Sequence, residues 1–119
     1  MKKQKNFKKM LVFVFVMMFL INILPIKTLA SSIVRSAYDF TSPWELYATE
    51  DSGKANMTYG YNVFAINEDY TWASHSSNYH YAAVHNGNGS FSGPNKPGSE
   101  LSKIEVTHSG AYVSYYNNY

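Results

Sequence analysis

Residues 57–66 decide the fold, and they read Met-Thr-Tyr-Gly-Tyr-Asn-Val-Phe-Ala-Ile. Large side chains recur at every second position, beginning with Met57, Tyr59 and Tyr61. A period of two places successive side chains on opposite faces of an extended chain, and aromatic and β-branched residues favour strands. The stretch therefore predicts a β-strand over residues 57–66.

Segments of the same kind follow towards the C-terminus, with turn residues between them. We expect strands over residues 70–75, 78–85, 103–108 and 111–116, and turns at 67–69, 86–89, 94–98 and 109–110. The strongest turn signal is Asn86-Gly87-Asn88-Gly89, because glycine tolerates positive φ. Five or six short strands with such turns predict an all-β domain over residues 56–119, a small antiparallel β-sandwich or barrel.

Residues 31–55 carry a different signal. Ser42-Pro43-Trp44-Glu45 combines an N-cap serine, a proline at the first helical position and a glutamate three residues after the cap. This pattern predicts one short helix over residues 44–50. We therefore interpret residues 31–55 as an N-terminal appendage or pro-segment that precedes the sandwich.

Residues 1–30 have the pattern of a secretory signal peptide, for which we expect an N-terminal signal helix. A lysine-rich head precedes a run of fifteen residues, Met10–Leu24, which is apolar except for Asn22, and small residues lead to a cleavage site after Ala30. An uncleaved membrane anchor is the alternative, but a membrane span needs about 20 apolar residues. We expect an exported, extracellular chain that begins at Ser31 and has no stable membrane span.

The charge distribution excludes two classes of protein. Residues 31–119 contain four basic and eight acidic residues, a net charge of −4, although the whole chain carries +2. A nucleic-acid binder needs a basic patch to neutralise phosphates, and a membrane-lytic helix needs a polar face rich in Lys and Arg. The exported part fits neither class.

The chain contains no cysteine, although small exported domains usually rely on disulfides. All eleven tyrosines follow residue 30, and large rings can replace part of an aliphatic core. Exposed edge strands and additional rings also allow self-association as a homodimer.

The polar residues do not match a known catalytic or metal-binding pattern. His75, His80 and His85 are spaced by five, which puts neighbouring histidines on opposite faces of a strand. We expect them at the surface or at sheet edges, without a metal or cofactor. The acid pair Glu68-Asp69 lies in a predicted turn, where carboxylates are usually solvated. The sequence predicts a protein that is not an enzyme.

Residues 56–119 resemble the lactococcin 972 family of secreted bacteriocins. The resemblance is carried by Tyr59-Gly60-Tyr61, Ser77-Asn78-Tyr79-His80, Tyr81-Ala82-Ala83-Val84, Pro97-Gly98 with Ser102-Lys103, and Ser114-Tyr115-Tyr116-Asn117. Two positions depart from the usual pattern, because Met57 and Leu101 stand where the family often has tryptophan. The resemblance implies a sandwich of two antiparallel sheets and an antibacterial protein that binds the cell-wall precursor lipid II, blocks septum formation and makes no pores.

Binding of the sugar-pyrophosphate head group is compatible with the residues present. Rings with hydrogen-bonding neighbours suit sugars, and backbone N–H groups in a glycine turn suit phosphate. The candidate ligand-binding residues are Tyr79, His80, Tyr81, Asn86, Gly87, Asn88 and Gly89. The alternative from another functional class is a secreted β-domain that binds wall or host carbohydrate without killing cells.

We expect the product exported by a Gram-positive host to begin at Ser31, which intact-mass analysis of the culture medium would establish. Ala30→Leu should retain the leader, because the cleavage site requires a small residue. Wild-type protein recovered from the medium with residues 1–30 still attached would contradict the signal-peptide assignment.

Overall fold

The computed structural model describes residues 31–119 and contains eight β-strands and no helix in that range. The strands are β1 (Ser32–Ala37), β2 (Trp44–Glu50), β3 (Ala55–Asn62), β4 (Glu68–His75), β5 (Tyr81–Asn86), β6 (Gly89–Ser92), β7 (Ser102–Thr107) and β8 (Val113–Asn118). The predicted signal peptide, its helix and its cleavage site lie outside the described residues. Within residues 31–119 there is no helix with the length and hydropathy needed to cross a bilayer.

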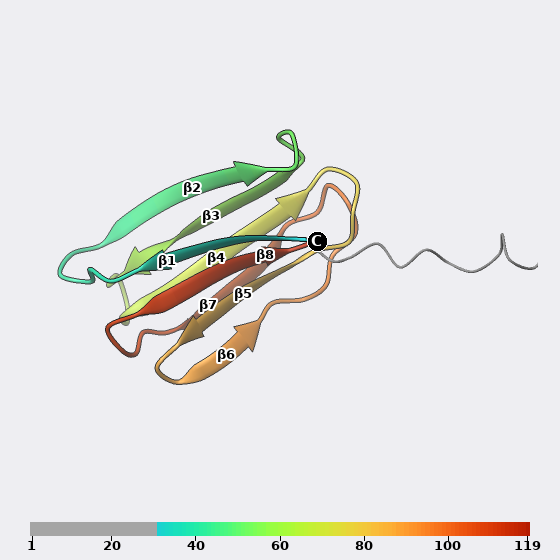
Figure 1. The fold of residues 1–119 in the computed structure, drawn as a ribbon. Helices are drawn as coiled ribbons and strands as arrows, with labels where there is room; N and C mark the ends of the chain where they lie inside the picture. Colours follow the sequence, from blue (N-terminus) through green and yellow to red (C-terminus); the bar gives the residue numbers. More distant parts are fainter. Residues whose placement is uncertain (1–30) are drawn as a thin grey trace, which may run out of the picture.

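The strands form two antiparallel four-stranded sheets that pack together, as Figure 1 shows. Sheet I has the order β1-β8-β5-β6 and sheet II the order β2-β3-β4-β7. The predicted all-β sandwich is confirmed. Residues 55–118 supply six of the eight strands, in agreement with the upper end of the expected number.

The short helix predicted over residues 44–50 is wrong, because these residues form β2. Residues 31–55 are also not an appendage of the sandwich: β1 pairs with β8, and β2 pairs with β3 along its whole length. The physical reason is alternation, since Trp44 and Ala48 lie on the face of sheet II that packs on sheet I, where Ala48 is buried. A helix of seven residues is marginal alone, whereas a strand gains backbone partners along the sheet edge.

The first predicted strand is too long at its C-terminal end. β3 ends at Asn62, and β4 begins at Glu68 within the predicted turn. Asn62 pairs with Glu68, so residues 63–67 form the hairpin loop. Val, Phe, Ala and Ile at 63–66 suit a strand, but this register leaves them no strand to pair with.

Aromatic rings fill much of the core between the sheets. The Tyr115 ring is fully buried and packs against Tyr59 of the opposite sheet, with the ring centroids 5.2 Å apart. Trp44 meets both rings edge-on, at 5.9 Å from Tyr59 and 5.7 Å from Tyr115. Such edge-to-face contacts add stability to the large apolar area that each ring buries. Packing of these rings stabilises the contact between the two sheets in a domain that has no disulfides.

A buried carboxylate joins the two sheets. Asp69 of β4 is inaccessible to solvent, which corrects the expectation of a solvated turn residue. Its Oδ2 accepts a hydrogen bond from Asn86 Nδ2 at 2.9 Å, and its Oδ1 lies 2.8 Å from His108 Nδ1. The hydroxyl of Tyr115 donates to Oδ1 at 3.4 Å. Asn86 and Tyr115 belong to sheet I, so one carboxylate fixes the position of one sheet on the other.

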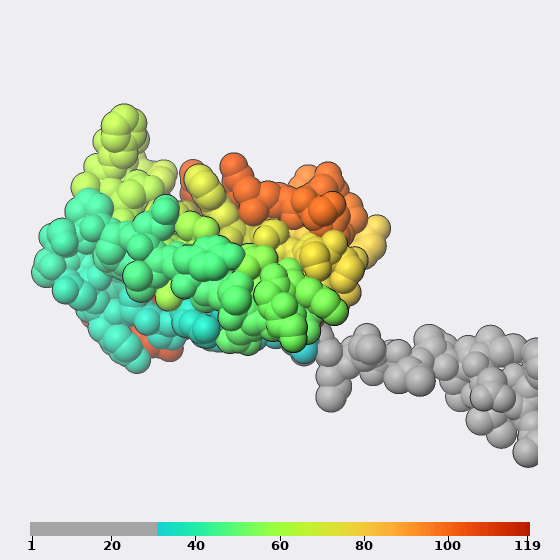
Figure 2. Space-filling model, turned by 90° about the horizontal axis from the view of Figure 1, so that it is seen from above, coloured from blue at the N-terminus to red at the C-terminus, as the bar shows by residue number. Residues whose placement is uncertain are grey.

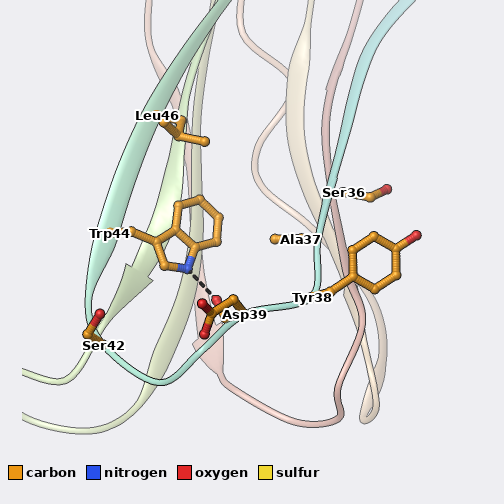
Figure 3. A pocket seen from close by; sticks show the side chains of 7 residues that line it. All are labelled: Ser36, Ala37, Tyr38, Asp39, Ser42, Trp44 and Leu46. Carbon is orange, nitrogen blue, oxygen red and sulfur yellow. Dashed lines mark hydrogen bonds between the residues drawn. The ribbon is translucent and has the colours of Figure 1, made fainter.

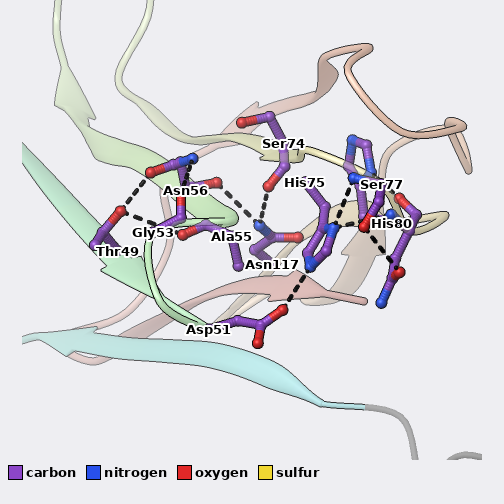
Figure 4. A network of polar contacts seen from close by, with 11 residues as sticks. Thr49, Asp51, Gly53, Ala55, Asn56, Ser74, His75, Ser77, His80 and Asn117 are labelled. Carbon is purple, nitrogen blue, oxygen red and sulfur yellow. Dashed lines mark hydrogen bonds and ion pairs between the residues drawn. The ribbon is translucent and has the colours of Figure 1, made fainter.

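A second polar network lies at the other end of β4, shown in Figure 4. His75 Nδ1 accepts hydrogen bonds from the N–H groups of Ser77 and Asn78, and its Nε2 lies 2.9 Å from the Asp51 carboxylate. His75 and His80 are each 1% exposed, so the expectation of surface or edge positions is wrong for both. Their ring nitrogens satisfy backbone groups of loops that would otherwise lack partners.

The strand register divides the molecule into two ends. The loops 38–43, 63–67, 87–88 and 108–112 lie at one end, which we call the loop end. Ser31 and Tyr119 lie at the opposite end, the terminal end, where each donates its N–H to the other's carbonyl oxygen at 2.8 and 2.9 Å. Residues far apart in the sequence are thus neighbours at both ends.

Asp69→Ala should lower the free energy of unfolding by about 3 kcal/mol or more, because three largely buried partners lose their acceptor at about 1–3 kcal/mol each. Urea unfolding followed by tryptophan fluorescence measures this loss. Glu105→Ala on the exposed face of β7 is the matched control and should stay within about 0.5 kcal/mol of wild type. Equal effects in the two variants would refute the role given to Asp69.

Stability should fall as the pH rises above about 10. Burial raises the pKa of Tyr115 and Tyr70 above the ordinary value of 10.0, and the Asp69 and Glu45 carboxylates raise them further. The folded chain keeps both hydroxyls protonated where the unfolded chain releases the protons, so unfolding is favoured at alkaline pH. Urea midpoints at about pH 8 and about pH 11 test this, and Tyr115→Phe should reduce the difference. An unchanged difference in that variant would contradict the prediction.

Candidate functional site

The structure separates the candidate ligand residues into two groups. Tyr79, His80 and Tyr81 lie where β5 begins, and the Asn86–Gly89 turn lies where β5 ends. Five residues of extended chain separate the groups by about 17 Å. They therefore do not converge on one small site.

His80 serves the fold in its own neighbourhood. Its Nδ1 lies 2.9 Å from the Asn78 carbonyl oxygen, and its Nε2 lies 2.7 Å from that of Glu100. Backbone hydrogen bonds in both directions join His80 to Lys96. The ring thus fastens the long loop between β6 and β7 to the start of β5. Tyr79 and Tyr81 on either side keep exposed rings.

Polar groups of the Asn86–Gly89 turn also form hydrogen bonds within the protein. Asn86 is buried and, besides its bond to Asp69, accepts a hydrogen bond from the Asn88 N–H at 2.9 Å. The Gly87 N–H donates to a carbonyl oxygen in the β7–β8 loop at 2.8 Å. Two of the N–H groups expected to hold a phosphate therefore already have partners.

A groove opens between the sheets at the loop end, where the chain crosses from β1 to β2. We call it the edge groove; it has a volume of about 470 Å³ and is shown in Figure 3. This volume lies within the usual range of about 300–1,000 Å³ for small-molecule sites. Its lining residues are Ser36, Ala37, Tyr38, Asp39, Ser42, Trp44 and Leu46.

The wall of the edge groove is rigidly held. Trp44 Nε1 donates to the Asp39 carbonyl oxygen at 2.9 Å, while the indole ring packs on the aromatic core. Phe40 anchors the crossing loop, with its ring 4.3 Å from His108 and 5.3 Å from Tyr61 between centroids. A ligand would thus meet a preformed surface, which reduces the entropy lost on binding.

The rim of the edge groove combines a ring with a carboxylate. The Tyr38 ring is 74% exposed and rests on Tyr112 at 5.0 Å. The Asp39 carboxylate accepts hydrogen bonds from the N–H and hydroxyl of Thr41, and these bonds lower its pKa. Both bonds use Oδ1, so within the described residues Oδ2 is available to a ligand's hydroxyl or amide. The groove lining contains no Lys or Arg.

The sequence interpretation missed this groove because it lies in the segment assigned to an appendage. Residues 44–50 alternate Trp44, Leu46 and Ala48 with more polar residues, and this period of two could have identified β2. The capping pattern at Ser42 obscured it.

A smaller hollow of about 210 Å³ lies on the outer face of sheet II. It is lined by Tyr47, Asn56, Met57, Thr58, Trp72, Ser74 and Leu101. Lys103 Nζ lies 4.4 Å above the centre of the Trp72 ring, a cation–π contact that covers one face. Trp72 Nε1 has no hydrogen-bond partner among the described residues. Its small volume makes this hollow the weaker candidate.

The described residues contain no cluster of three or more histidine or acidic side chains that could hold a metal. The close pairs His75–Asp51 and His108–Asp69 each join two segments of the sandwich. The edge groove offers binding groups, namely ring faces, hydroxyls and one carboxylate.

Comparisons with family models, with curated proteins and with solved structures find no match to this chain.

Proposed function

We propose that this protein is a secreted antibacterial protein of the lactococcin 972 type, which binds the saccharide part of lipid II and thereby blocks septum formation. The predicted secretory leader and the motifs of residues 56–119 support this proposal. The two-sheet architecture agrees with the fold that the resemblance implies.

The motif residues contribute mainly to the scaffold. A side chain at Gly60 would collide with the Trp44 carbonyl oxygen and the Tyr70 hydroxyl, and one at Gly98 would collide with the backbone of Ser77. Tyr115 and Asn117 are fully buried. The resemblance therefore supports a common fold, and ligand contacts are better sought among residues that the fold does not constrain.

We assign a sugar as the ligand because of the residues that line the edge groove. The exposed ring of Tyr38, the fixed indole of Trp44 and the Asp39 carboxylate present apolar faces beside a strong acceptor. Sugars offer the complementary pattern, with C–H faces for rings and hydroxyls for carboxylates. Because the lining has no cation and Asp39 is anionic, the groove suits the neutral sugars of the precursor better than its pyrophosphate.

The alternative, a secreted domain that binds wall or host carbohydrate without killing, uses the same groove. The two proposals differ in the consequence of binding for a growing cell. Growth inhibition and septum defects distinguish them, whereas affinity for a sugar does not.

A combined Tyr38→Ala and Asp39→Asn variant should bind the soluble disaccharide-pentapeptide of lipid II at least about tenfold more weakly than wild type, equivalent to about 1.4 kcal/mol. Titration calorimetry with the exported protein measures the affinity. Both side chains are exposed, so the fold should persist. Inhibition of growing Gram-positive cells should weaken in parallel.

Tyr47→Ala is the matched control, because it removes an exposed tyrosine from the smaller hollow. It should retain wild-type affinity. A loss confined to Tyr47→Ala would move the site to that hollow. Binding without growth inhibition would favour the non-killing alternative, and an absence of saccharide binding would refute both proposals.

A further inference from the structure

The β3–β4 loop exposes four consecutive apolar residues. These are Val63, Phe64, Ala65 and Ile66, and the Phe64 side chain is 99% exposed. In Figure 2 the yellow-green segment of the chain projects as a knob beyond the rest of the domain. We call residues 63–66 the apolar tip. Single exposed apolar residues are common, but a contiguous projecting group indicates an interaction site.

The two residues that flank the apolar tip carry no charge. Asn62 and Asn67 flank it, and residues 62–67 contain no ionisable side chain. A protruding knob leaves its side chains accessible from several directions. A flat protein surface would cover one side of it, whereas a fluid apolar phase can surround it.

Two tyrosines occupy the same end of the sandwich. Tyr38 and Tyr112 belong to the neighbouring loops 38–43 and 108–112, and they are 74% and 50% exposed. The Tyr112 hydroxyl bonds to Ser36 Oγ at 2.9 Å, so one side of this ring pair is polar. Tyrosine is enriched at membrane–water interfaces because its ring is apolar and its hydroxyl can hydrogen-bond to water.

We propose that the apolar tip inserts into the headgroup region of a lipid bilayer and holds the loop end of the sandwich against the membrane. Backbone groups of an irregular loop need water or polar partners, so insertion reaches the interface and not the hydrocarbon centre. Interfacial segments typically lie about 5–10 Å deep.

The charges near the apolar tip define the kind of surface it binds. Asp39 and Glu68 lie at the loop end, whereas Lys54 and Lys96 belong to segments of the terminal end. Attraction to anionic lipids therefore contributes little, and apolar burial supplies the affinity. The binding should resist salt and should not require anionic lipids.

This inference is independent of the ligand of the edge groove. If the proposed function is correct, the two features fit together, because the groove opens at the same end as the apolar tip. A membrane-anchored precursor would then meet the groove beside the bilayer.

The test uses the exported protein, since residues 31–119 contain both sheets and the whole described core. Its partition onto phosphatidylcholine vesicles, without lipid II, is measured by co-sedimentation. We expect binding that changes less than about twofold between low and high salt. Phe64→Ser combined with Ile66→Ser should weaken the partition at least about tenfold.

Leu101→Ser is the matched control, because Leu101 is an exposed apolar residue at the terminal end, just before β7. It should partition as wild type does. In Phe64→Trp, brominated lipids should quench a larger share of the tryptophan fluorescence than in wild type, which contains Trp44 and Trp72, and this difference reports insertion of residue 64. Circular dichroism establishes that each variant is folded.

The proposal is overturned if wild-type protein does not bind vesicles, or if Leu101→Ser weakens binding as much as the tip variant. A tip-dependent dimer in solution without vesicle binding would assign the apolar tip to a second copy of the chain and would equally overturn it. Failure of saccharide binding in calorimetry would leave these outcomes unchanged, so the two proposals can fail separately.

Discussion

The burial of the Asp69 carboxylate between the two sheets is the constraint on which the loop end depends. Desolvating a carboxylate is costly, and this cost is offset only while all its partners stay in place. Asn86 comes from β5, Tyr115 from β8 and His108 from the chain after β7. Sliding one sheet on the other would break several of these contacts together. The same His108 ring packs on Phe40 and so fixes the loop that forms the edge groove.

The sequence was sufficient for the fold class because period-two alternation is visible in the residues of β3 and β7 and turn residues separate the other C-terminal strands. It was insufficient where two local signals compete. At Ser42–Glu45 the residues satisfy a helix N-terminus, and only pairing with β3 selects the strand. At residues 63–66 the residue types favour a strand, and only the register of β3 on β4 makes them a loop. Both decisions depend on partners distant from the residues themselves.

The candidate site was harder to predict than the fold for a related reason. His80 and Asn86 attracted attention as polar residues beside rings and glycines, but their polar atoms satisfy backbone groups or other buried side chains. Residues that the fold needs form conspicuous motifs, because packing restricts what can replace them. Tyr38 and Asp39 belong to no such motif, and their significance depends on the groove that two separate strands create.

The pairing of β1 with β8 has a consequence for biogenesis. In sheet I, β1 lies at the edge and pairs with β8. Sheet I therefore cannot form completely until the chain is available as far as Asn118, more than eighty residues after Ser32. Contacts of such sequence separation form slowly, since a long loop must be ordered before they contribute. A chain that emerges from a translocation channel N-terminus first would therefore keep sheet I incomplete until β8 has emerged. In the proposed secreted protein, sheet I would thus be completed only after export of the C-terminal strand.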